Sequence, residues 1–186
     1  MKIVVGISGA SGAIYGIKTL EVLHQLGIES HVVISNAAEK TIQHETSYTI
    51  DQVQQLATQL YSQEDIGAAI SSGSFKVDGM IVAPCSIKTL SAIANSYNDE
   101  LITRAADVQL KERRKLVLMV RETPLNLSHL RHMTLITEMG GVILPPVPSF
   151  YHKPKDLDDI VSQSVGKALD QFGIDAKLFD RWKGMN

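Results

Sequence analysis

The sequence predicts an α/β fold in which one parallel sheet is covered by helices on both faces. Short apolar runs rich in β-branched residues alternate along the chain with longer segments of helical periodicity. Strands that are apolar on both sides belong to sheets buried on both faces. No repeat, low-complexity tract or break in composition divides the 186 residues. We therefore expect residues 1–186 to form a single domain with one substantial core.

The individual elements follow from these two patterns. Strands are predicted over the apolar runs Ile3–Ile7, Ser30–Ile34, Gly79–Ala83, Lys115–Val120 and Gly141–Leu144. Helices are predicted where apolar residues recur every three or four positions, over Ala13–Leu26, Asp51–Leu60, Leu101–Arg114, Leu127–Met139 and Leu157–Phe172. Gly140 and Gly173 stand where glycine commonly ends a helix. The tail, residues 174–186, contains Phe179 and Trp182 and is too short for a domain, so we expect it to dock on the subunit or on a neighbour.

Charge and composition exclude several functional classes. The chain has 18 Lys and Arg against 20 Asp and Glu, which gives no general attraction to nucleic acid or to an anionic membrane. No apolar run approaches the roughly 20 residues that cross a bilayer, and no secretory signal precedes the first strand. Cys85 is the single cysteine, so we expect a cytoplasmic protein with a buried, unreactive thiol. The six histidines show no metal-ligand spacing, so no metal site is predicted.

The strongest local motif follows the first predicted strand. In an open parallel sheet, ligands bind beyond the carboxyl ends of the strands. Here Gly6-Ile7-Ser8-Gly9-Ala10-Ser11-Gly12 leads into a helix, and a helix start offers free N–H groups to an anion. Gly9 and Gly12 match two glycines of the dinucleotide fingerprint, but Ile7 stands at the first, and no acidic residue after the second strand could hold the ribose of NAD. A bare turn and a phosphate-binding turn both stay open.

Polar residues follow the other strands as well. Ser35 can cap the next helix or bind a phosphate, and Ser86 and Thr89 have the same two possibilities. Arg121 and Glu122 follow the fourth strand and form either a ligand site or an internal ion pair.

Three further sets of residues are candidates of lower specificity. Arg104 and Lys111 recur at about whole helical turns, which places them toward one face of their helix. Glu45 is either a surface carboxylate or an acid/base group beside His44. Tyr151, near the end of the chain, is either a core aromatic or a hydroxyl donor.

Taken together and in order, these motifs resemble the UbiX-type flavin prenyltransferases over essentially the whole chain. The matching segments are Ser8-Gly9-Ala10-Ser11-Gly12, Pro84-Cys85-Ser86-Ile87-Lys88-Thr89-Leu90, Arg104-Ala105-Ala106-Asp107-Val108, Leu110-Lys111-Glu112-Arg113-Arg114, Arg121-Glu122-Thr123-Pro124, Leu144-Pro145-Pro146 and Phe150-Tyr151-His152. Older names in this family call such proteins aromatic-acid or 3-octaprenyl-4-hydroxybenzoate decarboxylases.

The resemblance implies a Rossmann-like (flavodoxin-like) subunit assembled into a dodecamer. It also implies that a dimethylallyl group moves from dimethylallyl monophosphate to N5 and C6 of reduced flavin mononucleotide (FMN), without a metal ion. The prenylated FMN would then serve a separate UbiD-type decarboxylase.

The family's site residues carry over to positions in this chain. FMN would be bound by Gly9, Ala10, Ser11, Ser35, Ser86, Ile87, Lys88, Thr89, Arg104 and Arg121. The prenyl phosphate would be bound by Lys111, Arg121, Glu122, Tyr151 and Lys167. The catalytic residues would be Ser11, Glu45, Lys111 and Glu122, with Ser11 and Glu45 managing protons near N5. The chain departs from some relatives at Lys167, where they have Arg, and at Ile66, where they have Trp.

Two other functions stay open on the sequence. An FMN-dependent cysteine decarboxylase of the phosphopantothenoylcysteine type depends on a catalytic His and on a Pro-Ala-Ser-Ala-Asn segment after the third strand. This chain has Pro84-Cys85-Ser86-Ile87-Lys88 at that place, and Lys111 and Arg121 favour a substrate that carries a phosphate. A flavin-storage subunit of a decarboxylase would need the flavin residues but no second anion site.

Overall fold

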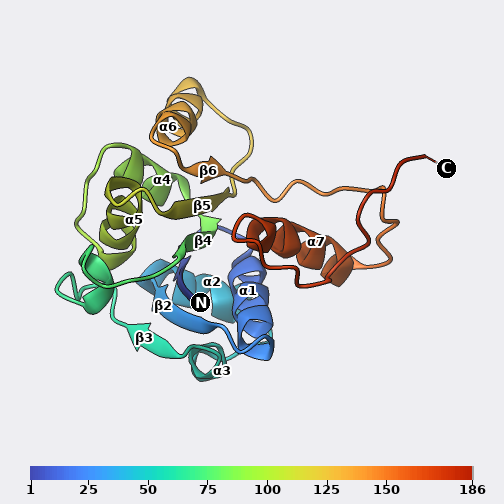
Figure 1. The fold of residues 1–186 in the computed structure, drawn as a ribbon, viewed down its shortest axis with the longest axis horizontal. Coiled ribbons are helices and arrows are strands. Elements are labelled where there is room, and N and C mark those ends of the chain that lie inside the picture. Colours follow the sequence, from blue (N-terminus) through green and yellow to red (C-terminus); the bar gives the residue numbers. More distant parts are fainter. Residues whose placement is uncertain (186) are drawn as a thin grey trace.

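The computed structural model describes residues 1–185 as a three-layer α/β fold (Figure 1). Its sheet has six strands in the order β3-β2-β1-β4-β5-β6, and every strand pair is parallel. The strands are β1 (Lys2–Ile7), β2 (Glu29–Ile34), β3 (Gln59–Tyr61), β4 (Gly79–Cys85), β5 (Lys115–Val120) and β6 (Val142–Ile143). The predicted fold class, a flavodoxin-like parallel sheet with helices on both faces, is confirmed.

Helices cover the two faces of the sheet unequally. They are α1 (Ala13–Gln25), α2 (Asn36–Glu45), α3 (Ile50–Gln55), α4 (Ile87–Ala94), α5 (Leu101–Lys111), α6 (Leu127–Glu138) and α7 (Leu157–Asp170), with a 3₁₀ turn at Ala69–Ser71. One core cluster joins the sheet to α1, α2, α3 and α7. The other joins it to α4, α5 and α6, which stand together on the opposite side in Figure 1. None of the helices in residues 1–185 has the length and apolar composition of a bilayer-spanning segment.

The strand order creates the place where a ligand can enter. The chain builds outward from β1 to β2 and β3, and then crosses to β4 on the other side of β1. Connections on the two sides of this switch point run to opposite faces of the sheet, so the loops after β1 and β4 separate and leave a crevice at the carboxyl edge.

One predicted helix is wrong over much of its length. The sequence suggested a helix over Asp51–Leu60, but α3 ends at Gln55 and Gln59–Tyr61 forms the edge strand β3, which pairs with β2. Thr49, not Asp51, caps the helix, since its hydroxyl accepts a hydrogen bond from the Gln52 N–H at 3.2 Å. Leu60 fits the helical period after Leu56, but it packs against the core from the strand. The other predicted elements are present with shifted ends, and the last strand is shorter.

The C-terminal tail lies along α7 of the same chain. A Cβ placed on Gly166 of α7 would lie 2.6 Å from the ring of Phe179, so only glycine leaves room for that ring. The Arg181 guanidinium contacts the carboxylate of Asp170 at 2.7 Å. Trp182 extends beyond these contacts, with its ring centroid 5.8 Å from that of Tyr151.

Candidate functional site

Two adjoining hollows lie at the carboxyl edge of the sheet, and the loop after β1 contributes to both. The first, which we call the switch-point hollow, has a volume of about 380 Å³. The second, which we call the Glu45 cavity, has a volume of about 520 Å³. Ser8 and Gly9 line the first, and Ser11 and Gly12 line the second. The predicted motif between β1 and α1 is therefore placed where the fold predicts a ligand.

Small and hydroxyl-bearing residues shape the switch-point hollow. Its lining residues are Ser8, Gly9, Ser35, Asn36, Ala37, Gln63, Ser86, Lys88, Thr89 and Glu100. Ser8 joins its two loops, because its hydroxyl donates to the Pro84 carbonyl and accepts from the Ser86 N–H, both at 2.8 Å. A Cβ on Gly9 would lie 2.4 Å from the Cβ of Ala37, so the loop and the start of α2 can approach this closely only with glycine.

Two helix starts face the switch-point hollow. Ser35 caps α2 by accepting from the Ala38 N–H at 3.1 Å, and Ser86 caps α4 by accepting from the Thr89 N–H at 3.3 Å. The capping role predicted for both serines is thus present. Each cap also places a hydroxyl beside a positive helix end, which suits an anionic group. Lys88 adds a cation at the rim, where its ammonium contacts Glu100 at 2.5 Å.

The Glu45 cavity contains a carboxylate bound to the start of α1. Gly12, the N-cap of α1, has φ +98° and provides no side-chain cap. Glu45, at the end of α2, supplies the missing acceptor, since its Oε2 accepts from the N–H groups of Gly12 at 2.7 Å and Ala13 at 3.4 Å. The carboxylate at the end of α2 therefore caps the preceding helix at a distance of 33 residues in sequence.

The environment of Glu45 keeps it ionised. Burial acts to raise the pKa of this carboxyl, but hydrogen bonds from Gly12, Ser11 and Ala13 and the positive charge of Arg121 together hold the pKa below its usual value. The rest of the cavity is lined by Ser11, Gly12, Ile14, Tyr15, His44, Thr46, Arg121, Leu157 and Val161. One wall is thus apolar, and the other carries a carboxylate, a hydroxyl and a guanidinium.

The two hollows together fit a flavin nucleotide. The hydroxyls and helix starts of the switch-point hollow are suited to a phosphate and its ribityl chain. The Glu45 cavity, with apolar and polar walls, is suited to a ring system that has both apolar faces and polar edges. Gly9 and Ser35 line the first hollow, and Ser11 and Arg121 line the second. The contiguous positions Gly9-Ala10-Ser11 connect them.

Several predicted residues lie elsewhere in the chain. Lys111 ends α5 at the amino edge of the sheet, where its ammonium pairs with Glu112 at 2.5 Å. Strand β5 runs from that edge to the opposite edge, where Arg121 follows it. The strand spans roughly 16 Å, at about 3.3 Å per residue. Arg104 joins α5 to the Ser71 carbonyl at 3.1 Å and, within α5, contacts Asp107 at 3.2 Å.

Of the remaining predicted phosphate ligands, Arg121 lines the Glu45 cavity, whereas Glu122, Tyr151 and Lys167 do not. Glu122 accepts a hydrogen bond from the Thr123 N–H at 2.9 Å and makes no ion pair with Arg121 within residues 1–185. Tyr151 is exposed on the segment before α7, and Lys167 pairs with Asp170 at 3.5 Å on α7 itself. A single chain therefore places most of the predicted flavin residues around the two hollows, but of the predicted prenyl-phosphate residues it places only Arg121 there.

Other residues of the two hollows are absent from the predicted set. Ser8 belongs to the β1 motif but was not assigned a role. Asn36 follows Ser35 directly after β2, whereas Gln63 enters the site because β3 brings the chain back beside β2. The Asn36 N–H donates to the Gln63 side chain at 3.1 Å. Leu157 and Val161 enter from α7, more than a hundred residues from Ser11. Ser8 and Asn36 carry a local signal that identifies them, because each closely follows a strand.

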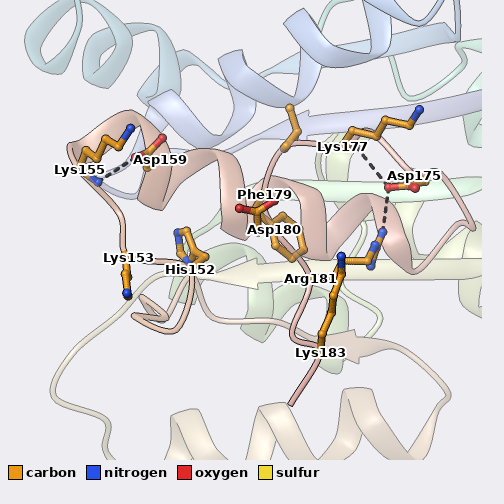
Figure 2. Close-up of a pocket in the computed structure, with 11 residues that line it drawn as sticks. His152, Lys153, Lys155, Asp159, Asp175, Lys177, Phe179, Asp180, Arg181 and Lys183 are labelled. Carbon is orange, nitrogen blue, oxygen red and sulfur yellow. Dashed lines mark hydrogen bonds and ion pairs between the residues drawn. The ribbon is translucent and has the colours of Figure 1, made fainter. Parts of the chain in front are cut away.

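A larger hollow at the C-terminal tail does not belong to this site. It has a volume of about 570 Å³ and is lined by α7 and the tail (Figure 2). Two of its charged side chains have partners within the hollow: Arg181 pairs with Asp175 at 3.0 Å, and Asp159 accepts from the Lys155 backbone at 2.8 Å. We regard it as a surface groove beside the docked tail.

Cys85 is a buried structural residue, as predicted. Its side chain at the end of β4 is 0% exposed, and burial raises the pKa of the thiol far above its usual value. It therefore has no thiolate for nucleophilic chemistry. Within residues 1–185, no group of three or more His, Cys, Asp and Glu side chains is placed to hold a metal ion.

Comparison with known proteins agrees with the geometry of this site. The model of the Flavoprotein family matches residues 1–169. Flavin prenyltransferase UbiX from Thauera aromatica is 62% identical over 184 residues, covering 99% of this chain and 95% of that protein.

Two solved structures superpose on the whole chain. A crystal structure of AnUbiX in complex with FMN and dimethylallyl pyrophosphate has a TM-score of 0.98 and 51% identity, covering 100% of this chain and 98% of the other. A dodecameric FMN-dependent UbiX-like decarboxylase from Escherichia coli O157:H7 has a TM-score of 0.97 and 48% identity, covering 99% and 100% of the two chains. With its site at the same sheet edge and its similarity spanning the full length, this chain belongs to the Flavoprotein family and, within it, to the UbiX flavin prenyltransferases.

Proposed function

We propose that this protein transfers a dimethylallyl group from dimethylallyl monophosphate to reduced FMN and releases prenylated FMN for a UbiD-type decarboxylase. The observation that carries the proposal is the composition of the Glu45 cavity. It places an ionised carboxylate, the Ser11 hydroxyl and the Arg121 guanidinium around one space at the flavin edge of the sheet. These groups provide what the reaction needs: an acceptor for a proton and a cation beside developing negative charge.

The chain's own residues would bind the nucleotide as follows. Ser35, Ser86, Thr89 and Lys88 would hold the polar end of FMN in the switch-point hollow. Ser11 and Arg121 would hold its ring system in the Glu45 cavity. Bound reduced FMN supplies the nucleophilic positions N5 and C6 that form the new bonds to carbon.

Glu45 would act as the proton acceptor through Ser11. Bond formation at N5 would release a proton, and the Ser11 hydroxyl, which lines the same cavity as Glu45 and helps to lower its pKa, would pass it to the carboxylate. Glu45 is itself exposed at the cavity rim, so it can return the proton to solvent. The leaving group is inorganic phosphate, whose negative charge needs cations and donors nearby.

We further propose that the prenyl-phosphate residues are supplied by neighbouring subunits. Lys111, Tyr151 and Lys167 are exposed in the isolated chain and lie away from the Glu45 cavity. Helix α6 leaves a row of leucines uncovered: Leu127 is 62%, Leu130 48% and Leu135 41% exposed. Such an apolar surface is typical of subunit interfaces. A homododecamer, as in the Escherichia coli O157:H7 relative, would cover it.

We place the protein in the cytoplasm, in keeping with its single buried cysteine.

The test is a direct assay of the flavin product. The purified protein is incubated anaerobically with reduced FMN and dimethylallyl monophosphate, and the extracted flavin is analysed by mass spectrometry. We expect a flavin heavier by one five-carbon prenyl unit. Unmodified flavin, extracted from folded protein that binds FMN, would contradict the proposal; a parallel sample with dimethylallyl pyrophosphate tests the donor.

The two other functions predict different results in the same assay. A cysteine decarboxylase would release CO₂ from a cysteine-containing substrate with oxidised FMN, and the flavin extracted from it would be unmodified. A storage subunit would bind FMN, modify nothing and be insensitive to substitution of Lys111. Ile87 and Lys88, where those decarboxylases carry the Ala-Asn end of their segment, favour the prenyltransferase.

A further inference from the structure

Arg114 follows the end of α5 and has no role in the proposed function. The helix ends in a turn that two backbone hydrogen bonds close. The Arg114 N–H donates to the Gln109 carbonyl at 2.9 Å, and the next bond inward runs from the Arg113 N–H to the Leu110 carbonyl at 3.1 Å. Arg113 has φ +57°, the left-handed conformation that belongs to this type of helix end. The turn therefore fixes Arg114 directly beside the last turn of α5, which carries Lys111.

The guanidinium of Arg114 holds the loop that leads to β4. Its Nη2 donates to the Gly73 carbonyl at 2.6 Å, and its Nη1 donates to the Phe75 carbonyl at 2.9 Å. The side chain of Arg114 is only 12% exposed, and hydrogen bonds from a charged donor are about twice as strong as those between neutral groups. Two bonds from one planar group fix both the position and the direction of the loop.

Gly73 in turn lies against Lys111. A Cβ on Gly73 would lie 2.8 Å from the Lys111 Nζ and 2.6 Å from the Glu112 Cδ, so both side chains rest on this glycine. Glu112 bridges two cations, since its Oε1 lies 2.5 Å from the Lys111 Nζ and its Oε2 lies 3.9 Å from the Arg114 Nη2. The hydrogen bond from Lys111 and the two positive charges hold the pKa of Glu112 below its usual value. The Lys111 ammonium is thus held between a loop and a carboxylate, and Arg114 contacts both.

We propose that Arg114 is a positioning residue of the prenyl-phosphate site that acts through Lys111. By fixing the Gly73 loop and the Glu112 carboxylate, it holds the Lys111 ammonium where the phosphate of the donor binds. The inference rests on the proposed function, in which Lys111 is supplied to the flavin site of a neighbouring subunit. An ammonium has three donors, so the bond to Glu112 leaves two for the phosphate. A side chain held in advance loses less entropy when the ligand binds, so the donor binds more tightly.

A double-mutant cycle on donor affinity tests this inference. Protein saturated with oxidised FMN is titrated with dimethylallyl monophosphate in a calorimeter, so that binding is measured without transfer. The cycle compares the parent, Arg114→Met, Lys111→Ala and the double variant. We expect Arg114→Met to raise the Kd of the donor roughly tenfold, the size of one hydrogen bond to a charged group, and to leave the Kd of FMN unchanged. In the Lys111→Ala background the same change should have no further effect, because no ammonium is left to position.

Arg114→Lys and Gly73→Ala test the two steps separately. Lysine keeps the charge but loses the planar fork that reaches both carbonyls, so donor affinity should fall as in Arg114→Met. Gly73→Ala leaves Arg114 intact, but the new Cβ must displace the Lys111 ammonium, and we expect a similar loss. Arg113→Met is the matched control. It removes the same charge from the neighbouring position, whose side chain is exposed, and the Kd of the donor should remain that of the parent.

Several results would overturn the inference. One is donor affinity like that of the parent in Arg114→Met, Arg114→Lys or Gly73→Ala. Others are an equal loss in both backgrounds of the cycle, and a matching loss in Arg113→Met, which would reduce the effect to general charge. Weakened FMN binding in Arg114→Met would also overturn it, because the residue would then support the fold as a whole. Circular dichroism of each variant verifies that the protein is folded.

The same measurements separate this inference from the proposed function. Parent-like donor affinity in Lys111→Ala would remove Lys111 from the phosphate site, and the inference would fall with that assignment. The cycle does not depend on prenyl transfer. A parent protein that binds the donor but forms no prenylated flavin would refute the proposed function, and the cycle would still decide the role of Arg114.

Discussion

The bond between Glu45 and the start of α1 leads to a prediction that separates structural from catalytic roles. In Glu45→Gln the side chain keeps an oxygen that can accept from Gly12, but it loses its charge. In Glu45→Ala the side chain loses both the acceptor oxygen and the charge. Because Glu45 caps α1 from another helix, the first variant reports on charge and the second on the whole cap.

The expected stability changes are small. Loss of an N-terminal capping acceptor costs about 0.5–2 kcal/mol, and loss of a charge near a helix N-terminus about 0.3–1 kcal/mol. Glu45 is exposed, so the lower halves of these ranges apply. At about 2–4 °C per kcal/mol for a chain of this size, we expect Tm to fall by about 1–3 °C in Glu45→Gln and by about 2–8 °C in Glu45→Ala.

The pH dependence of this difference follows from the direction of the pKa shift. The pKa of Glu45 is lower in the folded protein than in the unfolded chain. The charge therefore stabilises the fold above the unfolded pKa of about 4.3, and this contribution is lost as the pH falls through the folded pKa. The Tm gap between the parent and Glu45→Gln should be present at pH 7 and should close in acid.

The assay combines thermal melts with turnover. Melts are recorded from pH 7 to about pH 3, below the unfolded pKa, and at fixed protein concentration because assembly also affects Tm. Glu138→Gln, a change at the end of α6 far from the cavity, serves as the control.

In parallel, we expect Glu45→Gln to bind FMN normally but to transfer the prenyl group about a hundredfold more slowly or worse, as for loss of a general base. Parent-like turnover, or loss of bound FMN, would refute the catalytic role. A Tm gap that widens in acid would refute the electrostatic reasoning.

Three further outcomes are expected. Lys111→Ala should retain FMN yet lose prenyl transfer, checked by flavin absorbance and product mass, and equal activity would remove Lys111 from the phosphate site. Gly9→Ala should bind FMN at least tenfold more weakly, because its Cβ would lie 2.4 Å from that of Ala37 and must push the loop out of place; titration with FMN measures this, and unchanged affinity would show that the loop yields freely. Cys85 should not react with a thiol reagent until the protein unfolds, since it is fully buried and its pKa is raised; rapid labelling of the native protein would contradict its burial.

The sequence by itself determined the fold class and most of the flavin-facing loop. Alternation of buried strands and amphipathic helices depends on local periodicity, which the chain carries within each segment of ten to fifteen residues. The turn Ser8–Gly12 is also local, and its position after β1 follows from the general rule for parallel sheets. The family resemblance named several of the residues that line the two hollows, including Gly9, Ser35, Ser86 and Arg121.

Only the tertiary structure decided how distant residues meet. That Glu45 caps α1 depends on where α2 ends in space, and no periodicity encodes a contact across 33 residues. The edge strand β3 was taken for helix because Leu56 and Leu60 fit a helical period, while pairing with β2 prevailed. The structure also places Lys111 at the opposite edge of the sheet from Arg121. A sequence motif identifies residue types, but the path of the chain decides which of them can touch the same ligand.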